Sequence, residues 1–299
     1  MKKQSQMTLW AQVVKTGIIK SNLIPMIAGL MLALYTYQYS FVDNVWNVVF
    51  AFLGTAAVIA AAGAFNNIYD RDIDAIMART KVRPTVTGAI SIKKVLVAAI
   101  LLLVIGLILL YLNSPLASLL GFLGVFFYVV PYTMWTKRHT IWNTEVGSIS
   151  GAMPPLIGWA SVAPDIWHPA CWALFLIMVI WQMPHFYAIA IRKEKDYAAA
   201  NIPMLPVVKS GKRTYIQTNF YLILLVLSSF LFLPLSLGLT LISLILGLIW
   251  LGLSLFGQRK TEMKIWANKM FIFSLVHMMV IYFTVIIYAS IGLILNAFE

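Results

Sequence analysis

The chain has 299 residues, of which 61% are hydrophobic and only 11% are charged. A soluble protein of this length could not bury so much apolar surface, and the mean hydropathy of +0.87 therefore excludes a soluble globular protein and predicts a polytopic membrane protein. The net charge of +12 is explained better by basic loops that face anionic lipid than by binding to nucleic acid. We therefore exclude a nucleic-acid partner. The single Cys171 excludes an intrachain disulfide and is expected to be a packing residue.

Nine apolar stretches are long enough to cross a bilayer as helices. They lie near 21–39, 45–65, 95–112, 116–135, 146–163, 170–191, 215–233, 235–255 and 270–295. The run from Tyr215 to Gly257 counts as two spans, because one helix of this length would measure about 65 Å, and Pro234 divides it. Pro154-Pro155 predicts a kink in the fifth span. We therefore predict an all-α bundle of nine transmembrane helices.

The positions of the Lys and Arg residues test this count. They form five groups, and two spans separate each group from the next: Lys2 to Lys20, Arg71 to Lys94, Lys137 with Arg138, Arg192 to Arg213, and Arg259 to Lys269. The other loops carry Asp43 and Asp165, and the chain ends in Glu299. This pattern predicts a cytoplasmic N-terminus and an outside C-terminus in a bacterial cell membrane. The first 17 residues show no cleavage-site pattern, so the first span is expected to remain in the protein.

The loops also suggest an internal repeat. Residues 1–20 are expected to form a cytoplasmic segment, followed by a single domain over 21–295. Two cytoplasmic loops, 71–94 and 192–214, are longer than the rest and lie four spans apart, which suggests a four-helix unit repeated once. The two units would cover 21–135 and 146–255, with a final helix at 270–295.

One apolar span ends in a row of oxygen-bearing side chains. Asn66, Asp70 and Asp74 recur every fourth residue, and because steps of four on a helix turn by about 40°, the three side chains share one face. Such a row at a membrane surface is typical of a hard divalent cation such as Mg²⁺. A solvated helix end with Arg-paired acids is the alternative. Asp72 lies about 200° from Asp70 and is expected to be solvated or paired with an Arg.

Basic residues accompany this row. Arg79 and Arg83 follow it four residues apart, and Lys137 and Arg138 end the fourth span. Acids that bind a metal beside bases that bind an anion predict a site for a Mg²⁺-diphosphate group. Membrane topology alone is the competing explanation for each base.

Two further groups lie at the same membrane face. Tyr128 and Tyr132 are one helical turn apart, where they either anchor the span in the interface or stabilise an allylic carbocation by cation–π attraction. His185 lies in the sixth span near its cytoplasmic end, eleven residues before Asp196. A His at this place could ligate haem iron or transfer protons, whereas hydrogen-bonded helix packing is the more common role.

Together these residues resemble the UbiA-type intramembrane prenyltransferases. Asn66-x3-Asp70-x3-Asp74, continued by Arg79-Thr80-Lys81-Val82-Arg83-Pro84, is similar to the first acidic motif of that family in its protohaem IX farnesyltransferase (haem O synthase) branch. Further similar stretches are Tyr132-Thr133-x3-Lys137-Arg138, Gly151-Ala152-x-Pro154-Pro155-Leu156-Ile157-Gly158-Trp159, Pro184-His185-Phe186, and Asp196-Tyr197 through Pro203-Met204-Leu205-Pro206-Val207-Val208. The resemblance extends from about residue 15 to residue 290.

The resemblance implies a central cavity and Mg²⁺-dependent transfer of farnesyl from farnesyl diphosphate to a vinyl group of haem B, with water added to give haem O. A haem A synthase or a terminal oxidase assembly would be the partner. The implied roles are Mg²⁺ and diphosphate binding by Asn66, Asp70 and Asp74, phosphate binding by Arg79, Arg83, Lys137 and Arg138, contact with the allylic cation by Tyr128 or Tyr132, catalysis with Asp196, and substrate contact by His185.

One departure and two rival functions bear on this interpretation. Many relatives carry two acids four residues apart in a second motif, whereas Arg192-Lys193-Glu194-Lys195-Asp196 supplies only Asp196, so a second fully ligated Mg²⁺ is not expected. A prenyltransferase for an aromatic quinone precursor would share the first motif but not the Arg-Thr-x-x-Arg-Pro and Pro-His-Phe stretches. A transporter would place its acids near the membrane midplane rather than at its edge.

Overall fold

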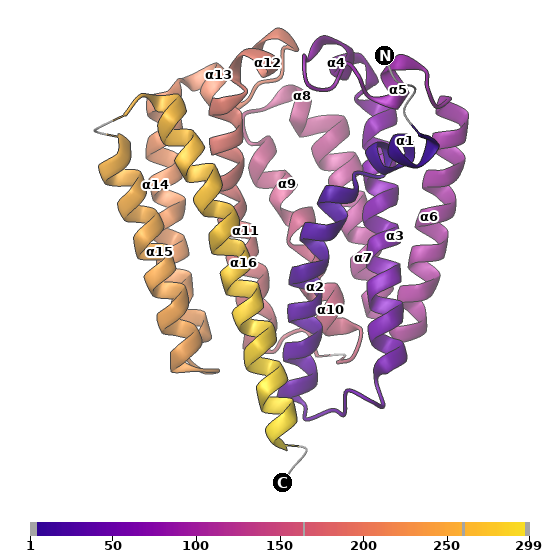
Figure 1. Ribbon diagram of the computed structural model, residues 1–299, viewed down its shortest axis with the longest axis vertical. Coiled ribbons are helices and arrows are strands. Elements are labelled where there is room, and N and C mark those ends of the chain that lie inside the picture. The colour runs from indigo at the N-terminus through magenta and orange to yellow at the C-terminus, as the bar shows by residue number, and fades with distance from the viewer. Residues whose placement is uncertain (1–4, 164, 259–260, 297–299) are drawn as a thin grey trace.

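The computed structural model describes residues 5–163, 165–258 and 261–296, and the regular secondary structure of these residues is helical. The long helices run side by side in one bundle (Figure 1). Within the described residues, eight helices are long and apolar enough to cross a membrane. They are α2 (Thr16–Thr36), α3 (Val45–Tyr69), α6 (Ile92–Asn113), the continuous run Pro115–His139, α11 (Pro169–Arg192), the run Gly211–Phe232, α15 (Leu237–Gln258) and α16 (Met263–Asn296). The expected all-α membrane protein is confirmed.

Two of these runs contain more than one helix type. The first consists of α7 (Pro115–Phe127), the π-helix η1 (Tyr128–Thr136) and α8 (Lys137–His139). The second consists of α14 (Gly211–Ser228) and the 3₁₀ turn η2 (Ser229–Phe232). A π-helix widens the helical turn and often occurs at functional sites.

The fifth expected span, 146–163, is not one long helix. It consists of α9 (Asn143–Gly151) and α10 (Met153–Ala160), which meet at Ala152. The break coincides with the predicted kink. Pro lacks a backbone N–H and is best accommodated in the first turn of a helix, and Pro154-Pro155 accordingly falls at the start of α10.

The second short helix, α10, is held against α2 by direct backbone contact. A Cβ atom on Gly158 would lie 1.9 Å from the carbonyl oxygen of Met26, and one on Gly29 would lie 2.1 Å from that of Pro155. Glycine is therefore required at both positions, because any side chain would separate the helices. Beside this crossing, the fully buried Trp159 belongs to the main hydrophobic core.

The same core contains Cys171. Its side chain is 1% exposed and carries a free thiol. The expected packing role of this residue is confirmed.

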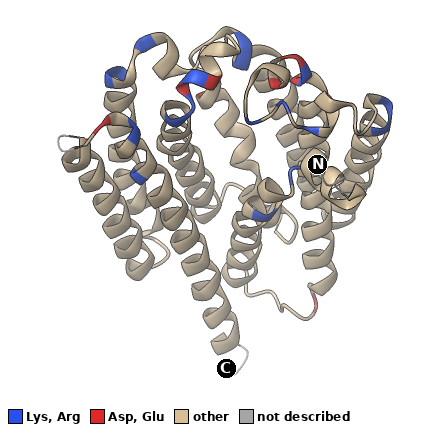
Figure 2. Ribbon diagram, turned by 45° about the horizontal axis from the view of Figure 1, so that its top comes forward, with Lys and Arg blue, Asp and Glu red and all other residues tan. Residues whose placement is uncertain are grey.

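Five short helices lie at one end of the bundle, which is the upper end in Figure 1. They are α1 (Gln6–Val13), α4 (Arg71–Ile76), α5 (Pro84–Thr87), α12 (Glu194–Ala199) and α13 (Leu205–Lys209). Lys and Arg gather at this end, as Figure 2 shows, whereas the loops at the other end carry Asp43 and Asp165. The bundle therefore has one strongly basic end. Lys2, Lys3, Arg259, Lys260 and Glu299 lie outside the described residues.

A small apolar cluster joins the two long loops of the basic end. Ile73 and Met77, which follow α3, pack with Ala200, Ile202 and Met204, which follow α11. Segments more than 120 residues apart in the sequence are thereby brought together. This contact places the stretch with the second acidic motif beside the first.

Candidate active site

The acid row continues through a break in its helix. The helix α3 ends at Tyr69, and Asp70 (φ −81°, ψ 6°) links it to α4. The amide of Asp70 still donates to the carbonyl of Asn66 at 2.9 Å, and that of Asp74 to the carbonyl of Asp70 at 2.8 Å. These i to i+4 bonds preserve the helical spacing, so the three side chains remain on one side.

The row is buried rather than solvated. Asn66 is 2% exposed, Asp70 is 0% exposed and Asp74 is 3% exposed. Unpaired charges are costly at such burial, so each acid must have a compensating partner. The alternative of a solvated helix end is therefore wrong for Asp70 and Asp74.

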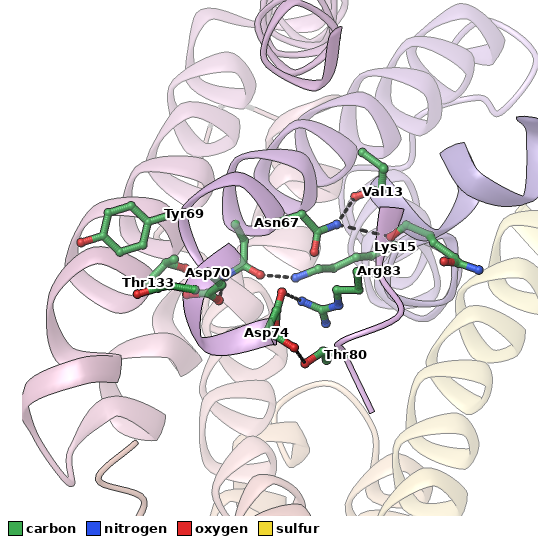
Figure 3. A network of polar contacts seen from close by, with 12 residues as sticks. Val13, Lys15, Asn67, Tyr69, Asp70, Asp74, Thr80, Arg83 and Thr133 are labelled. Atoms are coloured by element: carbon green, nitrogen blue, oxygen red, sulfur yellow. Dashed lines mark hydrogen bonds and ion pairs between the residues drawn. The ribbon is translucent and has the colours of Figure 1, made fainter. Parts of the chain in front are cut away.

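Each residue of the row accepts a hydrogen bond from a cationic side chain. Figure 3 shows the pair of Arg83 and Asp74. The pairs are Lys15 Nζ to Asn66 Oδ1, Lys137 Nζ to Asp70 Oδ2, and Arg83 Nη1 to Asp74 Oδ2 at 2.5 Å. The three cations come from the start of α2, from α8 and from the loop between α4 and α5. Three segments thus converge on one buried group of two carboxylates and an amide.

Asn66 organises the centre of this group. Its Nδ2 donates to Asp70 Oδ2 at 2.7 Å and to Thr133 Oγ1 at 3.0 Å. The fully buried Thr133 lies on η1, so the amide ties α3 to the π-helix. Sequence reasoning did not select Thr133, because a Thr in an apolar span gives no signal of its own.

The row offers oxygen atoms suited to a metal. Asp70 Oδ1 is buried and has no hydrogen-bond donor, and the Arg138 guanidinium approaches it only to 3.7 Å. Among the described residues there is no group of three or more His, Cys, Asp and Glu side chains that could hold a metal ion. Mg²⁺ nevertheless needs only one or two carboxylates when substrate phosphates and water complete its shell. Asn66, Asp70 and Asp74 fit that requirement.

Asp72 points away from the row, as expected. Its side chain is 64% exposed and accepts two hydrogen bonds from Arg138, both at 2.7 Å. These bonds lower the pKa of Asp72 to about 2. Arg138 also donates to the Tyr69 carbonyl and stacks on the Tyr69 ring at 4.7 Å. Arg138 is therefore braced at the rim of the site, and phosphate binding by this residue stays a prediction.

Lys15 is a site residue that sequence reasoning assigned only to topology. It precedes α2 in a left-handed backbone conformation (φ 55°, ψ 55°), which is uncommon for a residue other than Gly. Asn67 of α3 donates to the Val13 carbonyl at 2.7 Å. A Cβ on Gly63 would lie 3.2 Å from the Val14 carbonyl oxygen, so the chain passes very close to α3 here. These contacts fix Lys15 over the acid row.

Cationic side chains outnumber acids around Lys15. Burial and repulsion from Arg83 and Lys137 together lower the pKa of Lys15 to about 7, while Asp70 and Asp74 oppose the shift. Three basic side chains therefore share the site with two acids. Such an excess of cationic groups favours a multivalent anion.

Tyr128 and Tyr132 lie next to this group on η1. Their ring centroids are 5.5 Å apart, and the Tyr128 hydroxyl accepts a hydrogen bond from Lys15 Nζ at 3.4 Å. A Cβ on Gly147 would lie 2.9 Å from the Tyr132 ring, so Gly147 lets α9 pack against that ring. Tyr128 thus contacts Lys15 beside the acid row and Tyr132 packs against Tyr128, whereas contact of either ring with an allylic cation stays a prediction.

The second motif lies close to the row but is not joined to it. Burial raises the pKa of Tyr197, Tyr132 raises it further, and the positive charges of Arg79 and Lys137 oppose the shift. Tyr197 packs against the apolar cluster that contains Ile73 and Met77, which directly follow the acid row or lie within it in sequence. Within the described residues, the side chains of Arg79 and Asp196 form no ion pair. Their catalytic and phosphate-binding roles stay predictions.

His185 lies apart from the acid row. Its Nδ1 is 2.7 Å from Ser274 Oγ, and its ring stacks on Trp181 at 4.6 Å and on Phe271 at 5.3 Å. These contacts join α11 to α16. The structure thus gives His185 the hydrogen-bonded packing role, and its contact with a substrate stays a prediction.

A buried carboxylate on α9 also escaped sequence reasoning. Glu145 Oε1 accepts hydrogen bonds from the Tyr187 hydroxyl and from Gln217 Nε2, the latter at 3.0 Å, while Oε2 is buried without a donor. The signal was available, since Glu145 is a single acid at the edge of the expected membrane span 146–163.

The fold and the site define a helical membrane protein with a buried group of two carboxylates and an amide, each member of which is paired with a cationic side chain. The chain belongs to the UbiA prenyltransferase family, whose sequence profile matches residues 22–275. The resemblance seen in the motifs is thereby confirmed.

Two relatives are similar over nearly their full length. The protein named protoheme IX farnesyltransferase 2 of Lysinibacillus sphaericus is 61% identical over 297 residues, which cover 99% of this chain and 94% of that protein. The protein named protoheme IX farnesyltransferase 1 of Bacillus cytotoxicus is 60% identical over 283 residues, which cover 95% and 93%.

Solved structures of distant proteins share the fold. A structure described as digeranylgeranylglyceryl phosphate synthase superposes with a TM-score of 0.76 at 17% identity, covering 95% of this chain and 98% of that chain. A UbiA homologue from Archaeoglobus fulgidus bound to GPP and Mg²⁺ superposes with a TM-score of 0.68 at 15% identity, covering 93% and 99%. At these identities the likeness shows the common helical fold.

Proposed function

We propose that this chain transfers a farnesyl group from farnesyl diphosphate to a vinyl group of haem B, with addition of water, to give haem O and diphosphate. One observation carries the diphosphate half of the proposal. The row of Asn66, Asp70 and Asp74 is buried, and each of its residues is hydrogen-bonded to a Lys or Arg side chain. The haem half is supported by relatives that are 61% and 60% identical and are named protoheme IX farnesyltransferases.

The proposal includes a membrane arrangement. Together α9 and α10 cover residues 143–160, which is about 27 Å of helix and close to the roughly 30 Å of a bilayer core. They would thus form a ninth crossing, with the basic end and N-terminus in the cytoplasm of a bacterial cell and the C-terminus outside. In this arrangement 21–135 and 146–255 are the repeated units, and a central cavity holds both substrates.

Asn66, Asp70 and Asp74 would hold Mg²⁺ in this scheme. When bound, the ion supplies positive charge to the diphosphate leaving group. The carboxylates are pre-positioned by the Asn66 amide and by the i to i+4 backbone bonds. We propose one fully ligated metal position, because the second motif contributes only Asp196.

The cationic side chains neutralise the diphosphate as the C–O bond of farnesyl diphosphate breaks. Lys15, Arg83 and Lys137 already lie in the site, Arg138 lies at its rim, and Arg79 lies on the loop that carries Arg83. Charges that are in place before the reaction stabilise the leaving group without reorganisation. If all five cationic side chains bound the diphosphate, they would hold it apart from the developing allylic cation.

The two Tyr rings would face the allylic cation that remains. Tyr128 and Tyr132 can stabilise it through their π faces while the apolar helices exclude water. The vinyl carbon then forms the new C–C bond, water adds to the resulting cation next to the porphyrin, and one proton is released. His185 would contact the haem, and a haem A synthase or terminal oxidase assembly would receive the product.

Haem extraction tests the proposal directly. Membranes from cells that express the chain should contain a new haem, more hydrophobic than haem B, that is missing from matched cells without it. Purified protein in detergent should form the same product from haem B, farnesyl diphosphate and Mg²⁺ with no ion gradient present. Prenylation of an aromatic quinone precursor instead of haem would support the sister-enzyme alternative, and absence of any turnover would overturn the enzyme assignment.

A further inference from the structure

We propose that a basic pocket between α11 and α16 binds the phosphate headgroup of an anionic phospholipid. The pocket has a volume of about 420 Å³ and is lined by Arg192, Lys193, Lys264, Ile265 and Asn268. Three of its five lining residues are cationic and none is acidic. The pocket shares no residue with the acid row, and the proposal does not depend on the farnesyl-transfer activity.

The cationic lining comes from two helices and is partly fixed in place. Arg192 is the last residue of α11, and its guanidinium carbon lies 4.3 Å from the centroid of the Phe271 ring on α16. This stacking holds the planar guanidinium group, which can bind phosphate oxygens in a bidentate manner. Lys264 and Asn268 are one turn apart on α16 and therefore present a cation and an amide on the same side.

The pocket lacks a neutralising acid. The ion pairs found in the part of the chain that the structure describes all involve Asp70, Asp72 and Asp74. Glu194 and Glu262 are the acids closest in sequence to the pocket, and neither lines it. The positive charge of the pocket is thus available to an anion from outside the chain.

The surface next to the pocket favours a lipid over a free phosphate ion. Ile265 lines the pocket and is 49% exposed, and Ile272, Val276 and Met279 are 54%, 46% and 38% exposed. Intervals of 7, 11 and 14 residues from Ile265 place all four on one face of α16. A headgroup in the pocket would therefore continue into acyl chains along an apolar helix face. Basic pockets between helices at a cytoplasmic membrane surface suit anionic headgroups.

Lipid binding to the purified full chain tests the proposal. Protein in a neutral detergent is titrated with phosphatidylglycerol or with phosphatidylcholine, and retained lipid is counted by native mass spectrometry. The wild type should prefer phosphatidylglycerol and saturate. The double variant R192Q/K264Q should bind phosphatidylglycerol roughly tenfold more weakly, because two charges near the headgroup are lost. The matched control K93Q/K94Q removes two exposed cations at the same end of the bundle and should bind as the wild type does.

Two further measurements distinguish a lipid headgroup from free phosphate and control for misfolding of the double variant. The single variant K264Q changes one exposed side chain and should show a smaller loss in the same direction. Inorganic phosphate at millimolar concentration should not displace the bound lipid. The proposal is overturned if inorganic phosphate displaces it fully, if phosphatidylcholine binds equally well, or if both double variants lose affinity to the same extent.

Discussion

The two long loops of the basic end, which follow α3 and α11, have very different chemistry. After α3, Asp70 and Asp74 are buried, and each is paired with a cation. After α11, the side chain of Asp196 takes part in none of the ion pairs of the described residues. Buried and compensated charge is costly to build and is typical of function. The comparison suggests that the first loop is the catalytic half and that the second mainly covers it.

The largest effect is expected when one carboxylate charge is removed from the acid row of the first loop. We expect D70N or D74N to lower the rate of haem O formation by about 10²- to 10³-fold, the cost typical of losing one preorganised electrostatic group. The rate is measured with purified protein, and protein yield and thermal unfolding serve as controls. An activity within a fewfold of wild type would contradict the central role of the row.

The next largest effect should come from Lys15. Loss of its charge in K15M removes a hydrogen bond to Asn66, and charge-assisted bonds of about 1.5–3 kcal/mol predict a fall of roughly ten- to a hundredfold in turnover. K15R should restore part of the rate. The control K20M removes an exposed Lys from the same helix and should leave the rate unchanged. Equal losses of turnover in K15M and K20M would mean that Lys15 only helps to set the membrane topology.

A smaller effect is expected in the second loop. We expect D196N to slow turnover by at most about tenfold, because a half-buried acid contributes less than a fully buried one. The Mg²⁺ concentration needed for half-maximal activity should change less in D196N than in D70N. If D196N were as damaging as D70N, the two loops would be functionally equivalent and the comparison would fail.

Much of the fold was predictable because hydrophobic length and basic loops are strong signals. The span near 146–163 could only be predicted as kinked, since the exact break depends on how α10 packs against α2 through Gly29 and Gly158. The row itself was predictable from its four-residue spacing. Lys15 and Thr133 were not selected, because each reaches its partners only through tertiary packing. Glu145 did offer a signal, as an acid at the edge of an expected span, but was not selected either.

The smallest expected effect separates Asp72 from its neighbours. Asp72 and Arg138 form an exposed ion pair, which is worth at most about 1 kcal/mol, so D72N should change haem O formation by no more than a fewfold. The pKa of Asp72 is lowered to about 2 in the folded protein, whereas the unfolded value is about 3.9. The pair therefore stabilises the fold above pH about 4, and this contribution is lost as the pH falls toward 2. Thermal unfolding of wild type and D72N should thus differ slightly at neutral pH and converge at pH 2. A large loss of activity in D72N would instead make Asp72 part of the catalytic row.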